Sequence, residues 1–222
     1  MLRYLLLDLD NTLYSDERGM ERDILRRMNE FVATYLGMSQ HEAREIRRER
    51  VKRYGTTLEW LMSEEGFTDP ERFFAAIHPE GEEYCIEPDP SLGALLDSID
   101  LPKAVFTNSP REHADRVLRR LGVAERFEAV YDIRFCSLKG KPHAEAFRSV
   151  CSSCGVGPEE ALFVDDLPKY VRGFVELGGN GVVLDEMGRH ADSGLRRIHS
   201  LAELPDLLAE EAASGSQLRL FD

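Results

Sequence analysis

Short apolar runs recur along the chain, and segments with helical periodicity separate them. Residues 4–9 (YLLLDL) are nearly all apolar and show no alternation, which is typical of a strand buried on both faces. Strands that alternate with helices predict a doubly wound, Rossmann-like α/β fold built on a parallel sheet. Similar apolar runs lie at Ala104–Thr107, Ala161–Val164 and Gly181–Leu184.

Two helices of this predicted core carry clear end signals. Residues 109–112 (SPRE) have the spacing of a capping box with proline at the first helical position. The helix that they open is expected to end at Gly122, because glycine favours the conformation that terminates helices. The next helix is expected at about 143–154, with Gly155 as its stop.

The segment between the first two predicted strands has a different pattern. Residues 15–90 contain helical periodicity and no convincing strand. The first helix is expected to close at Gly37, residues 39–42 (SQHE) form another capping box, and Trp60 is expected to pack in the core of this segment. We therefore expect an all-helical cap at 15–90 inserted into a discontinuous α/β core, residues 1–14 and 91–222.

Charge excludes two broad classes of partner. The 222 residues contain 28 Lys and Arg against 41 Asp and Glu, a formal net charge of −13. Such a balance argues against a general nucleic-acid binder or a protein that binds anionic membranes. A net negative charge is still compatible with a local basic pocket that binds a small anionic substrate.

Targeting and redox signals point to a cytoplasmic protein. The apolar run Leu5–Leu7 is closed at once by Asp8, so it is too short for a membrane span or a secretory leader. Cys151 and Cys154 are interpreted as two thiols one turn apart on a helix, because no second Cys/His pair with zinc-ligand spacing accompanies them. Residues 214–217 (SGSQ) are linker-like, and the end of the chain is expected to fray.

Two acids follow directly on the first predicted strand. Asp8 and Asp10 are spaced i, i+2, so their side chains can converge on one side of an extended chain. Ligands of open α/β sheets bind at the carboxyl ends of strands, and paired buried carboxylates favour a divalent cation with a preference for oxygen ligands. Taken alone, the pair is also compatible with a loop of helix-capping aspartates, although it favours the cation.

Three further elements strengthen the metal interpretation. Thr107 and Asn108 end the second strand and can hydrogen-bond phosphate oxygens. Lys141 precedes a helix and can neutralise an anion, although most lysines are simply solvated. Asp165 and Asp166 end another buried run and form a second acidic pair. This set favours a metal-dependent phosphoryl site.

The ordered set DLDNT, TN, KP and FVDD resembles the haloacid dehalogenase (HAD) superfamily of aspartate-nucleophile phosphohydrolases. The resemblance covers essentially the whole core, and the helical insertion is similar to the smaller cap of that superfamily. A narrower resemblance, to the pyrimidine 5′-nucleotidase branch, is carried by DLDNTLY, YGTTL, TNSPREHADRVLRRLGV and KPHAEAF. The YGTTL motif lies in the cap; its alternative interpretation is an ordinary break between two helices.

The resemblance implies a role for each motif residue. Asp8 would attack phosphorus and become an aspartyl-phosphate, and Asp10 would act as general acid and then general base. Thr107, Asn108 and Lys141 would bind the transferring phosphoryl group. Mg²⁺ would be held by Asp8, the backbone carbonyl of Asp10 and Asp166, with Asp165 close by.

Two positions depart from the family pattern. Leu167 stands where a small polar residue is usual, and Tyr170 stands where Asn or Asp is frequent. A tyrosine cannot act as a carboxylate near the metal, so metal affinity is expected to be weaker unless Asp165 takes over that role.

The function implied is a Mg²⁺-dependent phosphomonoester hydrolase for a small phosphorylated substrate, such as a pyrimidine nucleoside 5′-monophosphate. Alternatives are another capped phosphatase or a sugar phosphomutase of the same superfamily. Outside the enzymes, the alternative is a non-catalytic regulator on this scaffold. The presence of all the key acids and of Lys141 argues against that alternative. A dehalogenase is disfavoured because that chemistry does not need Asp10. The sequence gives no indication of the oligomeric state.

Overall fold

The computed structural model describes residues 1–15 and 19–214. Its centre is a six-stranded sheet in the order β3-β2-β1-β4-β5-β6, and every adjacent pair is parallel. This order confirms the predicted doubly wound, Rossmann-like fold, and the chain changes direction across the sheet between β1 and β4. The strands are β1 Tyr4–Leu7, β2 Lys103–Phe106, β3 Ala129–Tyr131, β4 Ala161–Asp165, β5 Asn180–Leu184 and β6 Arg197–Ile198.

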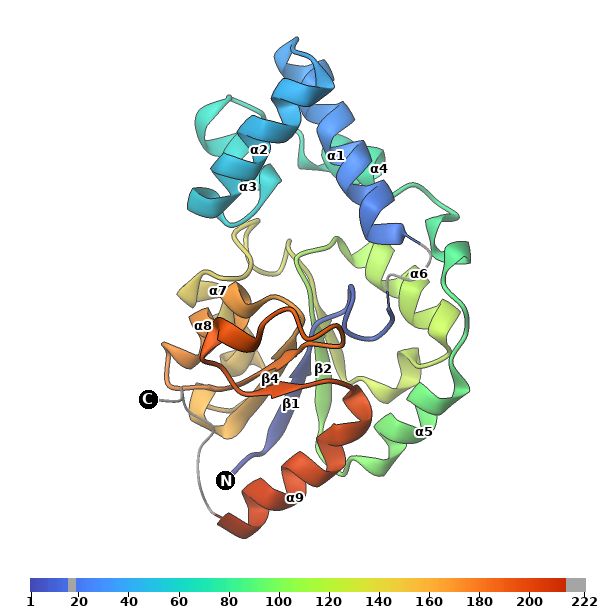
Figure 1. Cartoon of the computed structure of the whole chain (residues 1–222), viewed down its shortest axis with the longest axis vertical. Helices are drawn as coiled ribbons and strands as arrows, with labels where there is room; N and C mark the ends of the chain where they lie inside the picture. Colours follow the sequence, from blue (N-terminus) through green and yellow to red (C-terminus); the bar gives the residue numbers. More distant parts are fainter. Residues whose placement is uncertain (16–18, 215–222) are drawn as a thin grey trace.

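Helices flank the sheet and also form a separate group (Figure 1). Nine α-helices lie within the described ranges, and a short 3₁₀ turn at Glu82–Cys85 follows the fourth. The helices are α1 Met20–Leu36, α2 Gln40–Tyr54, α3 Thr57–Glu64, α4 Pro70–Ile77, α5 Pro90–Ser98, α6 Arg111–Leu121, α7 Ala144–Ser153, α8 Pro168–Val175 and α9 Leu204–Ser214.

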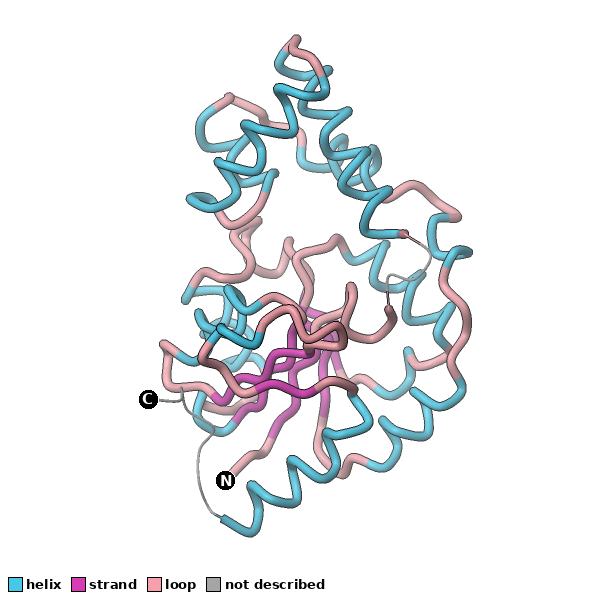
Figure 2. The backbone as a smooth tube through the Cα atoms, in the orientation of Figure 1, coloured by secondary structure: helices cyan, strands magenta, loops and turns pink. Residues whose placement is uncertain are grey.

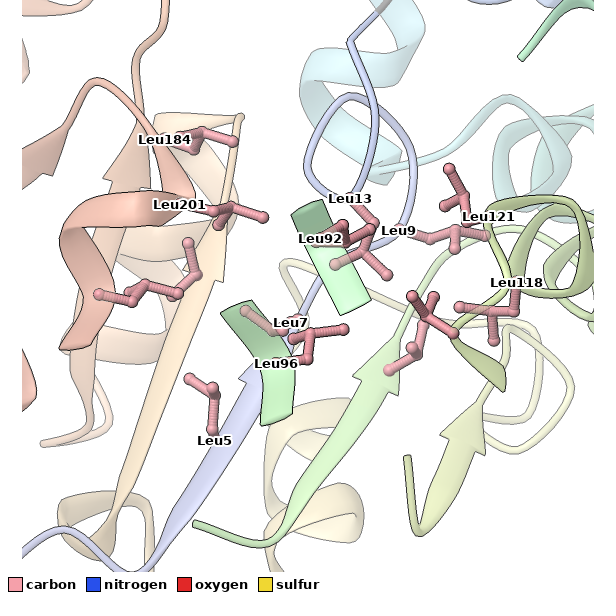
Figure 3. Close-up of a cluster of buried hydrophobic side chains, with 14 of the residues drawn as sticks. Leu5, Leu7, Leu9, Leu13, Leu92, Leu96, Leu118, Leu121, Leu184 and Leu201 are labelled. Carbon is pink, nitrogen blue, oxygen red and sulfur yellow. The ribbon is translucent and has the colours of Figure 1, made fainter. Parts of the chain in front are cut away.

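The side chains of β1 alternate between two apolar clusters, one on each face of the sheet. Leu5 and Leu7 pack with leucines of α5, α6 and α9 (Figure 3). Leu6 packs on the opposite face against aromatic residues that include Phe147 of α7 and Phe174 of α8. Burial of both faces explains why the strand reads as a continuous apolar run.

Helices α1 to α4 form a group at one end of the molecule, beyond the sheet (Figures 1 and 2). A third apolar cluster holds them together, with Trp60 and Leu61 fully buried in it. The expected end signals are present: Ser39 and Glu42 make a reciprocal capping box at the start of α2, and Gly37 closes α1 in the left-handed conformation.

Three sequence predictions need correction or comment. Strands β3 and β6 were not predicted, because three and two residues are too few to show a pattern. The predicted capping box at residues 109–112 is wrong: α6 starts without a side-chain cap from Ser109, whose hydroxyl instead donates to Asp10. The prediction for the C-terminal tail concerns residues 215–222, which lie outside the described ranges.

None of the described helices combines the length and apolar character that a membrane crossing requires.

Truncation of Phe174 should test the packing of α8 on the sheet. Its ring is fully buried, and its centroid lies 5.2 Å from the ring centroid of Phe147 and 5.5 Å from that of Phe163. Phe174→Ala should lower the free energy of unfolding by about 3–5 kcal/mol in urea denaturation. The control Met187→Ala, at a side chain that is 71% exposed, should change it by about 0.5 kcal/mol or less. Equal effects of the two would contradict this packing.

Candidate functional site

The two acidic pairs meet at the carboxyl ends of β1 and β4. These strands are neighbours, with Leu7 paired to Val164, and the amide of Asp8 donates to the carbonyl of Val164 at 2.9 Å. Asp8 and Asp165 therefore lie side by side at the point where the strand order reverses, which is where open α/β sheets bind ligands. Asn11, in the turn after Asp10, has a φ of 59°, a conformation that asparagine tolerates better than most residues.

The ammonium of Lys141 lies between two carboxylates. Its Nζ is 2.6 Å from Oδ1 of Asp8 and 2.6 Å from Oδ2 of Asp165, and the lysine is 1% exposed. Burial alone would lower the pKa of Lys141, but the two carboxylates outweigh it and raise that pKa above its usual value. The lysine is therefore fixed as a cation at the carboxyl ends of β1 and β4.

Three carboxylates form a cluster around this lysine. Asp8, Asp165 and Asp166 offer oxygen atoms that all lie within 4.8 Å of one another. Burial raises the pKa of Asp8 although Lys141 acts in the opposite direction, and burial together with the charges of Asp165 and Asp8 raises the pKa of Asp166. Three acids against one ammonium leave negative charge uncompensated, and this all-oxygen set fits a hard divalent cation such as Mg²⁺.

The carboxylate of Asp10 lies outside this cluster and is held by three other side chains. The hydroxyl of Tyr14 donates to Oδ1 at 2.7 Å, that of Ser109 donates to Oδ2 at 2.7 Å, and Nε2 of His113 is 2.7 Å from Oδ1. Burial would raise the pKa of Asp10, but the charge and hydrogen bond of His113 outweigh it and lower that pKa below its usual value. The two acids of the first motif thus occupy different environments.

His113 belongs to a buried chain of charges that the sequence did not reveal. Its Nδ1 lies 2.7 Å from Oε1 of Glu82, and Nδ1 of His78 lies 2.9 Å from the same oxygen. Burial lowers the pKa of His113, but Asp10 and Glu82 raise it to about 9 overall. Arg27 and Arg116 also bind Glu82, so protein cations already balance this carboxylate and a metal ion is disfavoured there. The signal available in sequence was the position of His113 within the apolar stripe of α6.

Thr107 and Asn108 lie at the end of β2, as predicted, but Asn108 has a specific structural task. Its Nδ2 donates to the carbonyl of Lys141 at 2.9 Å, and its Oδ1 accepts from the amide of Lys141 at 2.8 Å. A Cβ on Gly140 would lie 2.0 Å from that Oδ1, so glycine is required for this close approach. Thr107 is buried, and its Oγ1 accepts from the amide of Ser109 at 3.0 Å.

The two unusual residues of the last motif also lie at the site. The amide of Leu167 donates to Oδ1 of Asp165 at 2.8 Å. The ring of Tyr170 is one of three aromatic rings around the Lys141 ammonium, with its centroid 5.1 Å from Nζ; Phe106 and Phe163 are the others, each at 5.3 Å. Tyr170 therefore supports the lysine rather than the acids.

A cavity of about 260 Å³ connects these groups with the helical group. Asp8, Asp10, Lys141 and Asp166 line one part of it, together with residues that follow β2, and side chains of α1 to α4 line the opposite part. The helical group also touches the loop that carries Lys141, because Nε2 of His143 lies 2.7 Å from Oε2 of Glu59. The cavity is therefore enclosed by both parts of the chain.

Comparison with known proteins identifies relatives of this architecture. The family model of the haloacid dehalogenase-like hydrolases matches residues 2–178. Phosphate metabolism protein 8 of Saccharomyces cerevisiae is 25% identical over 194 residues, covering 79% of this chain and 59% of that protein. The N-acetylmuramic acid 6-phosphate phosphatase of Pseudomonas aeruginosa is 32% identical over 77 residues, covering 35% of this chain and 34% of that protein. The chain thus spans less than two thirds of the length of these curated relatives.

Solved structures share the whole fold. A HAD phosphatase from Thermococcus onnurineus superposes with a TM-score of 0.65 at 21% identity, covering 93% of this chain and 98% of the other. An L-2-haloacid dehalogenase from Xanthobacter autotrophicus gives a TM-score of 0.61 at 17% identity, covering 95% and 99%. At these identities the likeness concerns the fold alone.

Substitution of His113 should make stability depend on pH in a defined way. A pKa raised from 6.5 to about 9 means that the protonated imidazole stabilises the fold fully below pH 6.5 and progressively less up to pH 9. The difference in free energy of unfolding between the wild type and His113→Gln should shrink by roughly 3 kcal/mol across that interval. Urea denaturation in EDTA measures it, and the exposed His41→Gln serves as control. A difference that does not vary with pH would contradict the buried ion chain.

Proposed function

Because the chain belongs to the haloacid dehalogenase-like hydrolase family, we propose that it is a Mg²⁺-dependent phosphomonoester hydrolase that works through an aspartyl-phosphate. The observation that carries the proposal is the pairing of Asp8 with Lys141 beside Asp165 and Asp166, while Asp10 is held apart by hydrogen bonds of its own. Phosphoryl transfer needs in-line positioning and neutralised oxygens more than elaborate covalent machinery, and this arrangement supplies both.

The two acids of the first motif take different roles in this proposal. Asp8 attacks phosphorus and forms the aspartyl-phosphate, because it faces the cavity and is bound by the cationic Lys141. Asp10 also lines the cavity and is assigned the proton transfers. Its lowered pKa keeps it ionised at rest, so the proton for the leaving oxygen would come from the protonated His113 bonded to it, and Asp10 later accepts a proton from the hydrolytic water. The hydrogen bonds from Tyr14, Ser109 and His113 keep its carboxylate in place for both steps.

Lys141 and the end of β2 bind the phosphoryl group. The Lys141 ammonium is a fixed positive charge, and Thr107 lines the same cavity. Asn108 also lines it, and it acts in addition by holding the backbone of Lys141 in register. Positioning of this kind sets reaction rate because small displacements of a charged group weaken transition-state contacts.

The metal ligands proposed are the carboxylates of Asp8 and Asp166 and the backbone carbonyl of Asp10, with Asp165 adjoining them. The bound Mg²⁺ would supply charge neutralisation for the phosphoryl oxygens. Asp165 is engaged by Lys141 and by the amide of Leu167, so its main contribution is to orient that lysine.

The proposed substrate is a small phosphomonoester, and a pyrimidine nucleoside 5′-monophosphate is the preferred example. Two curated relatives are named for dephosphorylation of small sugar-like compounds, the N-acetylmuramic acid 6-phosphate phosphatase and the validoxylamine A 7′-phosphate phosphatase of Streptomyces hygroscopicus subsp. limoneus. The helical insertion, residues 15–90, would act as a cap that closes the cavity and selects the leaving group. The net charge of −13 favours a small molecule over nucleic acid as substrate, and the proposed location is cytoplasmic.

Dehalogenation is the second candidate, because haloacid dehalogenases share the fold. The environment of Asp10 argues against it. Three hydrogen-bonding partners hold a second carboxylate in the cavity, and displacement of halide by a carboxylate nucleophile requires no proton donor. Phosphate release from UMP, CMP, AMP, GMP and sugar phosphates, measured beside chloride release from 2-chloropropionate, separates the two activities.

Removal of divalent metal should abolish hydrolysis. Dialysis against EDTA should stop phosphate release, and Mg²⁺ should restore it, because the acidic cluster otherwise repels the anionic substrate. Mg²⁺ at 100 times its dissociation constant should also raise the free energy of unfolding by about 2.7 kcal/mol. The matched variant Asp166→Asn should lose most of that stabilisation. Full activity in chelator would rule out the metal assignment.

Substitution of the two acids should separate their roles. Asp8→Asn should form no phosphoenzyme, whereas Asp10→Asn keeps the nucleophile and loses a proton transfer worth a factor of roughly 10² to 10⁴. With an aryl phosphate, whose leaving group needs no proton, the aspartyl-phosphate should accumulate in Asp10→Asn. Intact mass of the acid-quenched protein detects it, and peptide mapping should place it on Asp8. A phosphate found on Asp10, Asp165 or a histidine would overturn the mechanism.

A further inference from the structure

The cavity has an apolar part that the proposed chemistry leaves unexplained. Beyond the acids, its walls are formed mainly by aliphatic and aromatic side chains of the helical group. An apolar wall of this kind accommodates a flat or hydrophobic leaving group better than a fully hydroxylated one. Most of the apolar lining residues come from α1 and α4, and they include Ile24, Leu25, Met28, Phe73, Phe74 and Ile77.

Arg47 of α2 is the basic residue of this apolar part, and Glu21 of α1 is an acidic residue that also lines the cavity. Its Nε donates to Oδ1 of Asn29 at 2.8 Å, and its Nη1 lies 3.5 Å from Oγ1 of Thr57 and 3.7 Å from the sulfur of Met28. All three partners are neutral, and among the described residues no carboxylate lies within ion-pair distance of Arg47. By contrast, Arg27 of α1 binds Glu82.

A half-buried guanidinium without a counter-charge retains strong binding capacity. It carries five N–H donors, of which neutral acceptors use only part, and partial burial makes each unmet bond costly. Burial, with the nearby charges of Arg48 and Arg44, lowers the pKa of Arg47 from its usual value, in keeping with its three neutral partners. A ligand that brings acceptor oxygens to this point would remove the imbalance.

The surroundings of Arg47 add further positive charge. Arg47 also lines a neighbouring hollow of about 610 Å³ between α1 and α2. Four further arginines and one acid line it as well: Arg22, Arg26, Arg44, Arg48 and Glu21. In a chain with a net charge of −13, this is a local basic surface beside the catalytic cavity. Such a surface favours electron-rich oxygen atoms over cationic or purely apolar groups.

The transferring phosphoryl group belongs at the acidic part of the cavity, with Asp8 and Lys141, and these residues come from the sheet rather than from α2. We propose that Arg47 recognises the leaving group: its planar guanidinium binds carbonyl or carboxylate oxygens at the end of the substrate remote from the phosphoryl group, while the apolar walls pack on the body between them. This inference rests on the proposed phosphomonoesterase function. It restricts the substrate class to monoesters with an acceptor-bearing, partly apolar leaving group, to which a pyrimidine base conforms.

The test compares substrates that differ only in the distal acceptor. Phenyl phosphate and 4-carboxyphenyl phosphate share a flat apolar body, and UMP supplies carbonyl oxygens. In Arg47→Met, the ratio of kcat/KM for the carboxylated ester to that for phenyl phosphate should fall about 10- to 100-fold, mainly through KM, as loss of a charged hydrogen bond predicts. Arg47→Lys keeps the charge without the planar guanidinium, so it should recover part of the lost ratio.

Two controls make the result decisive. Arg44→Met removes a neighbouring arginine of α2 that does not line the catalytic cavity, so its ratio should equal that of the wild type. Circular dichroism and thermal unfolding establish that each variant is folded. An unchanged ratio in Arg47→Met, or an equal loss on all three esters, overturns the inference. If kcat/KM of Arg47→Met falls for the carboxylated ester alone, a carboxylate is the preferred group. If it falls for UMP alone, a carbonyl is the preferred group.

Binding without turnover distinguishes failure of the inference from failure of the proposed function. Calorimetry with uridine and with 4-hydroxybenzoate, which are leaving groups without phosphate, should show affinity for the wild type that Arg47→Met weakens at least tenfold. If the wild type hydrolyses none of the esters but this difference is found, the proposed function is wrong and the role of Arg47 stands. Equal binding, or no binding, by the wild type and Arg47→Met overturns the inference.

Discussion

The buried ammonium of Lys141 is the interaction on which the rest of the site depends. A lysine that is 1% exposed is tolerated only because two carboxylates 2.6 Å away offset its desolvation. Those carboxylates are available because β1 and β4 are adjacent and end at the same level, so Asp8 and Asp165 face one another. Removal of either acid would leave an imperfectly balanced charge inside the protein. The geometry of the candidate site and the stability of the fold therefore rest on the same contacts.

Much of this core was predictable, because its information is local. The four longer strands span four or five residues and each contains an apolar run of three or four. The site acids lie at the ends of the neighbouring β1 and β4, so strand adjacency brings them together. Strands β3 and β6 escaped prediction since two or three residues carry no periodicity. Ser109 shows how a tertiary contact overrides a local pattern: its hydroxyl donates to Asp10, which lies 99 positions away in sequence, instead of capping α6.

The support of Asp10 was not predictable for the same reason. His113 belongs to the apolar stripe of α6, and its partner Glu82 lies 31 residues away in a short 3₁₀ turn. No spacing rule connects these positions; only the packing of that turn against the helix does. Tyr170 illustrates the opposite situation, because its departure from the family pattern was visible in sequence and its place beside the lysine was not.

The hydrogen-bonded side chains that hold Asp10 also determine which part of the helical insertion can be exchanged between relatives. Tyr14 stands on the segment that leaves the sheet, and Glu82 stands on the segment that returns to it. A transplant of residues 15–90 from a relative would replace Glu82 and leave Asp10 as the remaining carboxylate partner of the buried His113, whereas a transplant confined to 20–77 retains both partners. The boundary between the interchangeable module and the catalytic framework thus runs inside the insertion, and engineered chimaeras should be joined there.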